Sequence, residues 1–463
     1  MIVRQKFRYA GCLQQQLMAL FLSNQLIWLA DQGQEVIGIY PKSLLVLESN
    51  HSARHHIRSL DLQSVTDERL DFLDFRELIH FLTSSSANLT TPKIAGFCGG
   101  LMGFVGYDVA AALAQNVPIQ GDQPKAVLGI YDVFFRLESG EWWLYGPSTP
   151  AHLTLYQQID QRVIQAIASQ ATLTFQLLHP LMPRWSFSQY AQAFGQVQDY
   201  LKAGDCYQVN LTQAFDGRMT GDLLPLLESL MTLTRAPFAG YLRCGDLELL
   251  SCSPELFIAL EDQQTIVTRP IKGTRPRLAD PVADEASKAQ LIASDKDRSE
   301  NLMIVDLLRN DLSIHAKVGS VHVPKLFEIE SFAQVHHMVS EIRATLTTDQ
   351  SALQVVMDAL PGGSITGAPK IRAMQIIDEL EAGPRGAYCG SMGYLNADGT
   401  GRFNILIRTL QRVGQDLQIW AGGGITIASE LESEYQECLD KIGAIVDHVN
   451  QWQSTTDPLD IPD

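Results

Sequence analysis

Short strand-like runs recur along this chain and are not followed by helices in a regular rhythm. Partial alternation of apolar and polar residues over such lengths is typical of strands in antiparallel sheets. A parallel sheet needs a crossover helix after nearly every strand, and most runs lack one. The pattern therefore predicts an α+β fold built on large antiparallel sheets. The runs are EVIGIY (35–40), SLLVLES (43–49), EWWLYG (141–146), YQVNLTQAF (207–215), AYCGSMGYLN (387–396), GRFNILIRTLQRV (401–413) and LQIWAGGGITI (417–427).

Three segments carry helical patterns. Ser188 is placed to cap a helix that ends at Gly204. Residues 282–311 form a long helical region. Residues 429–449 form another helix, for which Ser429 and Glu432 have the spacing of a capping box. We expect these helices to pack around the sheets.

The 463 residues are 46% hydrophobic and 19% charged, which is ordinary for a globular protein of one large domain or two to three smaller ones. The proline-bearing stretch 179–185 separates an N-terminal region, 1–180, from a C-terminal region, 185–450. We expect the two regions to be interwoven in one large domain. The glycine-rich run GGLMGFVGYD (99–108) suits tightly packed strands or a sharp turn.

Charge and cysteine usage narrow the class of protein. The formal net charge of -17 argues against nucleic-acid binding. No apolar run is long enough to span a membrane, and the N-terminus does not resemble a signal peptide. The seven cysteines are an odd number and contain no CxxC pair, so no disulfide framework or zinc site is indicated. A cytoplasmic location fits best. The cysteines are at 12, 98, 206, 244, 252, 389 and 438.

Carboxylates on two helical segments could bind a divalent cation. Glu434 and Glu437 are three residues apart and share a helix face, with Lys441 four residues after Glu437. If Glu300 faces them from the other helix, the oxygens suit Mg²⁺, which usually takes one or two protein carboxylates plus substrate and water. From the spacing alone, two solvated helix faces with Glu–Lys pairs explain the pattern as well.

Two glycine loops and one arginine could bind an anion. The loops PGGSITGAPK (361–370) and AGGGIT (421–426) offer unshielded backbone N–H groups, although such loops are more often simple turns. Arg408 lies in an apolar run, and a buried arginine needs either a structural ion pair or an anionic ligand. His336 and His337 should point to opposite faces of a strand, so at most one enters a given pocket.

The densest basic segment is RPIKGTRPR (269–277), which has Lys272 at its centre. Glu255, in a Ser-Pro-Glu sequence, lies on the predicted strand before it. A hairpin could bring Glu255 and Lys272 together as an acid and a nucleophile, or merely as one more salt bridge. The sequence does not show whether Arg269, Arg275 and Arg277 supply positive electrostatic potential or only hold the segment in place.

In this order, these motifs resemble the chorismate-utilising enzyme family. They span roughly residues 185–450, and GGLMGFVGYD in the N-terminal region also resembles the family. The matching motifs are CYQVNLTQ (206–213), SPELF (253–257), RPIKGTRPR (269–277), DRSENLMIVDLLRNDL (297–312), VHHMVSE (335–341), LPGGSITGAPK (360–370), GYLN (393–396), FNILIRT (403–409), AGGGIT (421–426) and ESEYQECLDKI (432–442).

The resemblance implies a large sandwich of two antiparallel β-sheets with surrounding helices. It also implies chorismate as substrate and Mg²⁺ as cofactor. The implied metal ligands are Glu300, Glu434 and Glu437, and the implied catalytic residues are the nucleophile Lys272 and the acid Glu255. The implied substrate-binding residues are Gln208, Gly273, Thr274, His337, Thr366, Tyr394, Arg408, Gly422, Gly423, Gly424 and Lys441.

Two positions point to a subgroup. Family members that add water to chorismate carry a lysine at the position of Gln208, and glutamine cannot act as a base at neutral pH. Anthranilate synthases typically carry alanine at the position of Lys272. The PIKGT form resembles the aminodeoxychorismate synthases of the 4-aminobenzoate and folate branch. The resemblance implies that ammonia comes from a separate glutamine amidotransferase subunit or from solution.

Two alternatives stay open at this point. The chain could be an anthranilate synthase component, which would release pyruvate. It could also be an inactive, tryptophan-binding regulatory relative, although the intact candidate catalytic residues argue against this. The run LLVLES near residue 45 resembles the tryptophan-binding element of anthranilate synthases, and a plain core strand explains it equally well.

Overall fold

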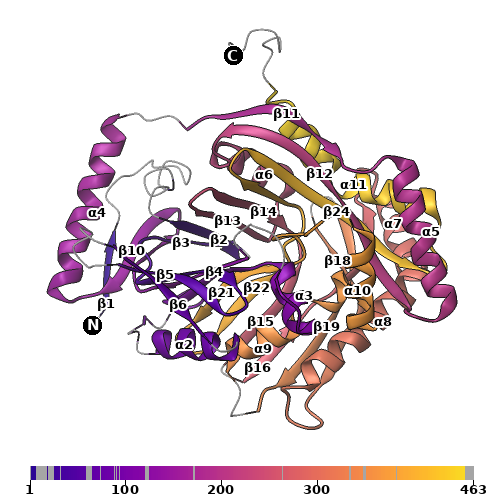
Figure 1. Cartoon of the computed structure of the whole chain (residues 1–463), viewed down its shortest axis with the longest axis horizontal. Helices are drawn as coiled ribbons and strands as arrows, with labels where there is room; N and C mark the ends of the chain where they lie inside the picture. The colour runs from indigo at the N-terminus through magenta and orange to yellow at the C-terminus, as the bar shows by residue number, and fades with distance from the viewer. Residues whose placement is uncertain are drawn as a thin grey trace.

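In a computed structural model, the chain forms two large antiparallel sheets packed face to face, with helices on the outer faces (Figure 1). The structure describes residues 2–6, 18, 25–31, 33–58, 65–72, 75–87, 89, 91–92, 94–119, 125–169, 173–262, 264–332, 335–347, 351–381 and 383–453. Cys12 lies outside these ranges, and the other six cysteines are buried and unbridged. The predicted α+β sandwich is confirmed.

Sheet A has twelve strands, and both regions of the chain contribute to it. In spatial order they are β1 (Ile2–Lys6), β10 (Glu141–Pro147), β9 (Phe134–Glu138), β3 (Gln34–Gly38), β2 (Leu26–Asp31), β13 (Phe238–Cys244), β14 (Leu247–Ser253), β23 (Thr409–Val413), β24 (Asp416–Thr426), β12 (Gln208–Gly221) and β11 (Phe175–Pro183), with β20 (Gly367–Ala368) beside β12.

Sheet B also has twelve strands from both regions. In spatial order they are β17 (Ile271–Pro276), β19 (Val335–Thr345), β16 (Thr265–Thr268), β15 (Leu256–Asp262), β22 (Gly401–Asn404), β21 (Ser391–Asn396), β7 (Gly100–Val105), β8 (Ala126–Tyr131), β4 (Ser43–Ser49), β5 (Ser52–Arg58) and β6 (Val65–Asp71), with β18 (His322–Ser331) beside β19.

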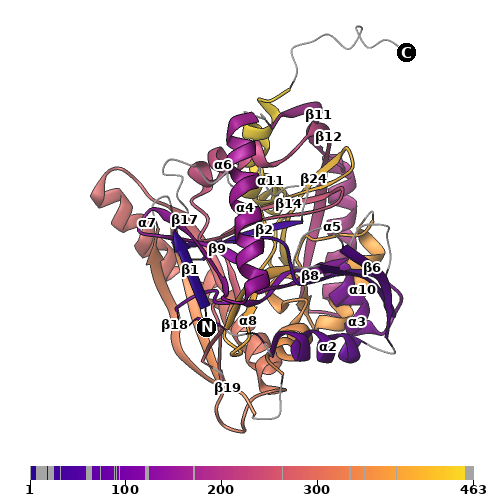
Figure 2. The ribbon, with the colours of Figure 1, turned by 90° about the vertical axis from the view of Figure 1, so that its left-hand side faces the viewer.

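Most of the helices pack on the outer faces of the two sheets (Figure 2). None of those in the described ranges is long and apolar enough to cross a membrane. They are α2 (Phe75–Ala87), α3 (Tyr107–Gln115), α4 (Pro150–Ser169), α5 (Phe187–Ala203), α6 (Leu227–Thr234), α7 (Pro281–Ala293), α8 (Asp295–Ser313), α9 (Ala352–Ala359), α10 (Lys370–Leu380) and α11 (Leu431–Asn450), with short 3₁₀ turns at Leu224–Leu226 and Gly363–Ile365.

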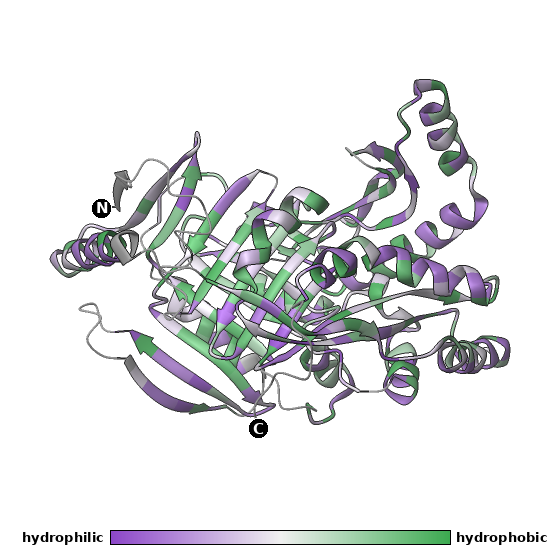
Figure 3. Ribbon diagram, turned by 90° about the horizontal axis from the view of Figure 1, so that it is seen from above, coloured by the Kyte–Doolittle hydropathy of each residue, from purple (hydrophilic) through white to green (hydrophobic). Residues whose placement is uncertain are grey.

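Strand alternation divides the apolar side chains between two faces. On β14, Leu249 belongs to the cluster between the sheets that also contains Met102 of β7, whereas its neighbour Leu250 belongs to the outer cluster under α6. Both faces of the central strands are covered, and these strands carry many apolar residues (Figure 3). This explains why the sequence runs alternate only in part.

Three details of the predicted helices were wrong. Ser186, and not Ser188, caps α5, and it forms a capping box with Gln189. The region 282–311 contains two helices, because the chain turns out of α7 at Ser294, which then caps α8. At α11 no capping box forms, since the Ser429 hydroxyl donates to Glu434 instead.

A buried ion pair lies in the segment between α10 and β21. Both carboxylate oxygens of Glu381 accept hydrogen bonds from Arg385, at 2.7 and 2.8 Å, and both side chains are 1% exposed. Arg385 also donates to the backbone carbonyls of Asn210 and Ile365. The pair therefore fixes the loop that contains Ile365 against the start of β12.

Replacing Arg385 with methionine should lower the free energy of unfolding by about 3–5 kcal/mol, because Glu381 would be left as a buried, uncompensated charge. Denaturant unfolding measures this change. The exposed Arg309–Asp306 pair on α8 provides a matched control. Arg309→Met should cost about 1 kcal/mol or less. Equal costs for the two variants would contradict the role assigned to the buried pair.

Candidate active site

The candidate site lies where the chain crosses between the two sheets. Residues 254–255 connect β14 in sheet A to β15 in sheet B, and residues 405–408 connect β22 in sheet B to β23 in sheet A. The two crossings run side by side: the Ser253 hydroxyl donates to the Ile405 carbonyl at 2.6 Å, and the Ile405 N–H donates to the Glu255 carbonyl at 3.2 Å. The run 401–413, expected as one strand, is thus two strands in different sheets.

The crossings position Glu255 and Arg408 close together. Glu255 is 8% exposed, and Arg408 has a positive φ of 52°. No carboxylate pairs with Arg408 among the described residues. Burial lowers the pKa of Arg408, and the Glu255 carboxylate raises it in part. The sequence left two partners open for Arg408, a structural ion pair or an anionic ligand. The geometry favours the anionic ligand.

A bulge sets the position of Lys272. In the β17–β19 ladder, Ile271 pairs with Val339 but Thr274 pairs with His337, so Lys272 and Gly273 form an irregularity. Gly273 has a φ of 82°, and a Cβ there would stand 2.8 Å from Leu291 and 2.9 Å from Asp297. Glycine is therefore required for steric and conformational reasons.

The arginines around Lys272 brace the segment. Arg269 pairs with Glu330, Arg275 with Asp297 at 3.2 Å, and Arg277 with Asp284 at 2.9 Å. Lys272 itself makes no ion pair among the described residues, and its Nζ donates only to the Ser364 carbonyl, at 3.5 Å. Of the four cations in RPIKGTRPR, Lys272 is the one left for a ligand.

Burial makes Lys272 easier to deprotonate than an ordinary lysine. Burial lowers the pKa of Lys272, and the Lys441 ammonium lowers it further. The carboxylates of Glu255, Glu300 and Glu437 oppose this shift without cancelling it. A neutral amine is the form that can act as a nucleophile.

Glu255 is held in a state that can donate a proton. Burial raises the pKa of Glu255 to about 7, against the lowering effects of the Lys272 charge and a backbone hydrogen bond from Ile271. Near neutral pH a substantial share of this carboxyl group is protonated. The structure thus brings together an acid and a lysine that loses its proton unusually easily.

Three glutamates form the more open side of the site. Glu300 on α8 has a raised pKa because of burial, with the Glu434 charge adding to it. Glu434 on α11 is 3% exposed and accepts a hydrogen bond from Ser429 at 2.7 Å. Glu437 pairs with Lys441 at 2.8 Å. Lys441 also donates to the Gly422 carbonyl at 2.8 Å, which fixes α11 on β24.

This donor set fits a divalent cation. The described residues contain no ready-made group of three or more ligands. The Lys296 ammonium lies between Glu434 and Glu300, at 3.6 and 4.0 Å, where a cation is favoured. Gly423 leaves the space open, since a Cβ there would stand 3.0 Å from Glu434 Oε2. Two carboxylates completed by substrate and water oxygens would satisfy Mg²⁺.

The remaining predicted residues extend the site along the strands. Thr274 Oγ1 lies 2.8 Å from His337 Nδ1, and burial lowers the pKa of His337 to about 4, with the Arg408 charge contributing. His336 instead contacts Ser331 and Asp284, as expected for the opposite face. Gln208 is 1% exposed, and its amide lies against Gly424.

Two predicted residues are not brought to this group by their contacts. Thr366 is fully buried and its hydroxyl donates to the Gly362 carbonyl, so it shapes its own loop. Tyr394 lies between the sheets, where its hydroxyl donates to Asp31 at 3.1 Å and its ring contacts Phe97. Alternation on β21 points Tyr394 to the same interior face as Met392, and the geometry gives it no part in the site.

Two groups that contribute to the site were not predicted from the sequence. The Ser364 carbonyl, which accepts from Lys272, carries no side-chain signal. Lys296, between the glutamates, could have been found from its i,i+4 spacing to Glu300 on one helix.

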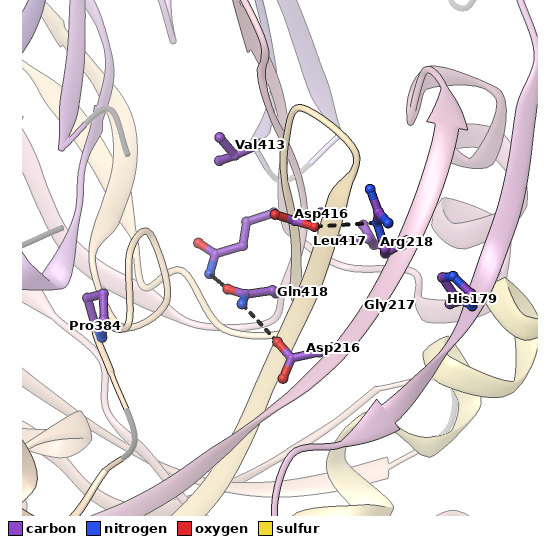
Figure 4. A pocket seen from close by; sticks show the side chains of 10 residues that line it. His179, Asp216, Gly217, Arg218, Pro384, Val413, Asp416, Leu417 and Gln418 are labelled. Atoms are coloured by element: carbon purple, nitrogen blue, oxygen red, sulfur yellow. Dashed lines mark hydrogen bonds and ion pairs between the residues drawn. The ribbon is translucent and has the colours of Figure 1, made fainter. Parts of the chain in front are cut away.

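A separate cavity of about 660 Å³ lies elsewhere (Figure 4). It is lined in part by Asp216 and Gln418, which hydrogen-bond to each other at 2.8 Å. Along the β12–β24 ladder, Asp216 is eight residues from Gln208, or roughly 27 Å. None of the predicted site residues lines this cavity.

Comparisons with known proteins identify relatives of this chain. The aminodeoxychorismate synthase component 1 of Klebsiella aerogenes is 43% identical over 358 residues, which cover 76% of this chain and 77% of that protein. The anthranilate synthase component 1 of Methanothermobacter thermautotrophicus is 33% identical over 356 residues, covering 76% and 75%. The crystal structure of anthranilate synthase component I from Streptococcus pneumoniae superposes with a TM-score of 0.73 at 25% identity, covering 89% of this chain and 92% of that one.

A family model described as chorismate binding enzyme matches residues 24–447, which include both crossings, the β17 bulge and the glutamates of α8 and α11. This chain belongs to the family of chorismate binding enzymes.

Proposed function

We propose that the chain is the chorismate-aminating component of an aminodeoxychorismate synthase, which converts chorismate and ammonia to 4-amino-4-deoxychorismate. The observation that carries this proposal is Lys272: it makes no ion pair among the described residues, and burial lowers its pKa beside the protonatable Glu255. Similarity also supports it, since the aminodeoxychorismate synthase relative shares more identity with this chain than the anthranilate synthase relative does.

Chorismate is a dianion, and the site offers separate cationic and polar groups for two carboxylates. Arg408, with backbone N–H groups of Gly423 and Gly424, would bind the enolpyruvyl carboxylate; the segment 421–426, expected as a loop, is the end of strand β24. The Thr274 hydroxyl and the Gly273 N–H would bind the ring carboxylate. Glu300, Glu434 and Glu437 would hold Mg²⁺, which would neutralise the charge of that carboxylate. Lys441 balances the acidic cluster from α11.

The reaction would proceed by two substitutions. The neutral amine of Lys272 adds to C2, the ring double bonds shift, and the C4 hydroxyl leaves as water with a proton from Glu255. Ammonia then adds to C4, the double bonds shift back, and the lysine nitrogen leaves C2. The enolpyruvyl group is retained, so no pyruvate is released.

Lys272 and the other site residues do not generate ammonia in this scheme. We propose that a glutamine amidotransferase subunit supplies it, in keeping with the name component 1 of the relative. Ammonia at high concentration in solution should replace that subunit. A cytoplasmic location accords with this role. Tryptophan binding near β4, where the LLVLES run lies, stays a prediction.

The product identifies the reaction. We expect the chain, incubated with chorismate, Mg²⁺ and ammonium at mildly alkaline pH, to give a product with the mass of chorismate in which an amino group replaces one hydroxyl group. Mass spectrometry measures this product. Pyruvate release with the fluorescence of 2-aminobenzoate would instead indicate an anthranilate synthase, and absence of any turnover would indicate an inactive relative.

A further inference from the structure

Lys296 lies among all three candidate metal-binding glutamates. It belongs to the first turn of α8, and its Nζ is 3.6 Å from Glu434 Oε1 on α11 and 4.0 Å from Glu300 Oε1 on its own helix. The Glu437 charge also acts on it. Lys296 is therefore the cation that bridges α8 and α11 at the open side of the site.

The surroundings of Lys296 allow it to leave while the carboxylates stay. Its side chain is 50% exposed, whereas that of Glu434 is 4% exposed and is hydrogen-bonded to Ser429. Gly423 presents only backbone to the glutamates. A lysine has a long, flexible stem, so its ammonium can move into solvent at little cost.

A divalent cation and an ammonium cannot both occupy one small cluster of carboxylates. Two positive charges about 4 Å apart repel strongly near a protein surface, and each would lose part of its attraction to the same oxygens. Without any cation, Glu300 and Glu434 would repel each other across the two helices. One cation at a time satisfies both requirements.

We propose that Lys296 acts as an internal competitor for the divalent cation: its ammonium occupies the glutamate cluster in the metal-free enzyme and leaves when Mg²⁺ binds. Lys296 thus weakens the binding of Mg²⁺ and keeps α8 and α11 together until the metal and substrate arrive. This inference rests on the proposed Mg²⁺ site and assigns the residue that sets its affinity.

Calorimetric titration of the full chain with Mg²⁺, without chorismate, tests the competition. Replacing Lys296 with methionine, which keeps the stem and removes the charge, should tighten Mg²⁺ binding about tenfold or more. Lys296→Gln should behave in the same way, and Lys296→Arg should stay close to the natural protein. Lys288→Met on α7 removes the same charge away from the cluster and serves as the control.

Thermal unfolding provides a second readout that does not depend on turnover. In the absence of Mg²⁺ the Lys296→Met variant should unfold at a lower temperature than the natural protein. Saturating Mg²⁺ should raise its unfolding temperature by more, because the tighter-binding form gains more stability from the ligand.

The outcomes separate this inference from the proposed function. If the natural protein binds Mg²⁺ and Lys296→Met binds it no more tightly than Lys288→Met, the competition is refuted while the metal site stands. If both Lys296→Met and Lys296→Gln bind Mg²⁺ more weakly, Lys296 supports the metal and the inference is likewise refuted. If neither the natural protein nor any variant binds Mg²⁺, with or without chorismate, the metal site itself fails.

Discussion

Replacing Lys272 with alanine should lower the rate of chorismate amination by roughly 10³-fold or more, as expected when a catalytic nucleophile is removed. Burial and the Lys441 charge lower the pKa of Lys272, which makes the reactive neutral amine accessible. The bulge of β17 also leaves Lys272 as the one cation of its segment that makes no ion pair among the described residues. Steady-state kinetics with ammonium as amine donor measure the loss.

Arginine at this position distinguishes a nucleophile from a positive charge. A guanidinium stays protonated in proteins and cannot attack C2. Lys272→Arg should therefore be as inactive as Lys272→Ala. If Lys272→Arg retained most of the activity, Lys272 would be an electrostatic residue. Lys325→Ala on β18, a half-exposed lysine paired with Glu328 and Glu341, should leave the rate unchanged.

Replacing Glu255 with glutamine should lower the rate by roughly 10²–10³-fold, within the range found for general acids. Glutamine keeps the size of the side chain and can hydrogen-bond, but it cannot deliver a proton to the departing C4 hydroxyl. Glu261→Gln, at the exposed end of β15, should have no such effect. Equal activity of both variants with the natural protein would remove Glu255 from the mechanism.

The pH profile adds a qualitative test of Glu255. The reaction needs Lys272 neutral and Glu255 protonated, so kcat/KM should rise with pH as the lysine loses its proton and fall as the carboxyl loses its own. Burial raises the pKa of Glu255 to about 7, which keeps the protonated form available near neutral pH. Because the two groups interact, the two apparent pKa values of the bell-shaped profile describe the pair and not either residue alone. In Glu255→Gln the falling limb should disappear, and the residual rate should keep rising with pH.

Local patterns predicted some strands closely where the run stays in one sheet. The run SLLVLES forms β4 over the residues expected, Ser43–Ser49, because its length and apolar content suit a strand covered on both faces. The run 401–413 was misjudged because its strand-like composition hides a change of sheet. Residues 405–408 leave sheet B and enter sheet A, and no local signal marks such a long-range event.

The candidate site shows the same division. Glu255, Lys272, Arg408 and the glutamates of α8 and α11 were recognised from motif order, and the structure brings them together by the crossings and by the docking of α11 on β24. The motif did not show that Tyr394 faces between the sheets, because a motif shows which residues recur and not which face of a strand they occupy. Its hydrogen bond to Asp31 joins positions 363 residues apart in the chain.

The roles of the arginines could not be predicted for a similar reason. Arg269, Arg275 and Arg277 have partners on β18, α8 and α7, and those partners are brought close only by the tertiary fold. Once these three charges are paired, Lys272 stands apart from them. The sequence shows four cations in one segment, and only the fold shows that three of them are paired and that Lys272 is not.

The most direct test of the central claim is the intact mass of the protein after incubation with chorismate and Mg²⁺ in the absence of ammonia. We predict an added mass equal to chorismate less one water, located on the peptide containing Lys272 and lost when ammonium is supplied. The adduct should be missing in Lys272→Ala. An unmodified protein that nevertheless turns over once ammonium is added, or an adduct on a different residue, would contradict the account.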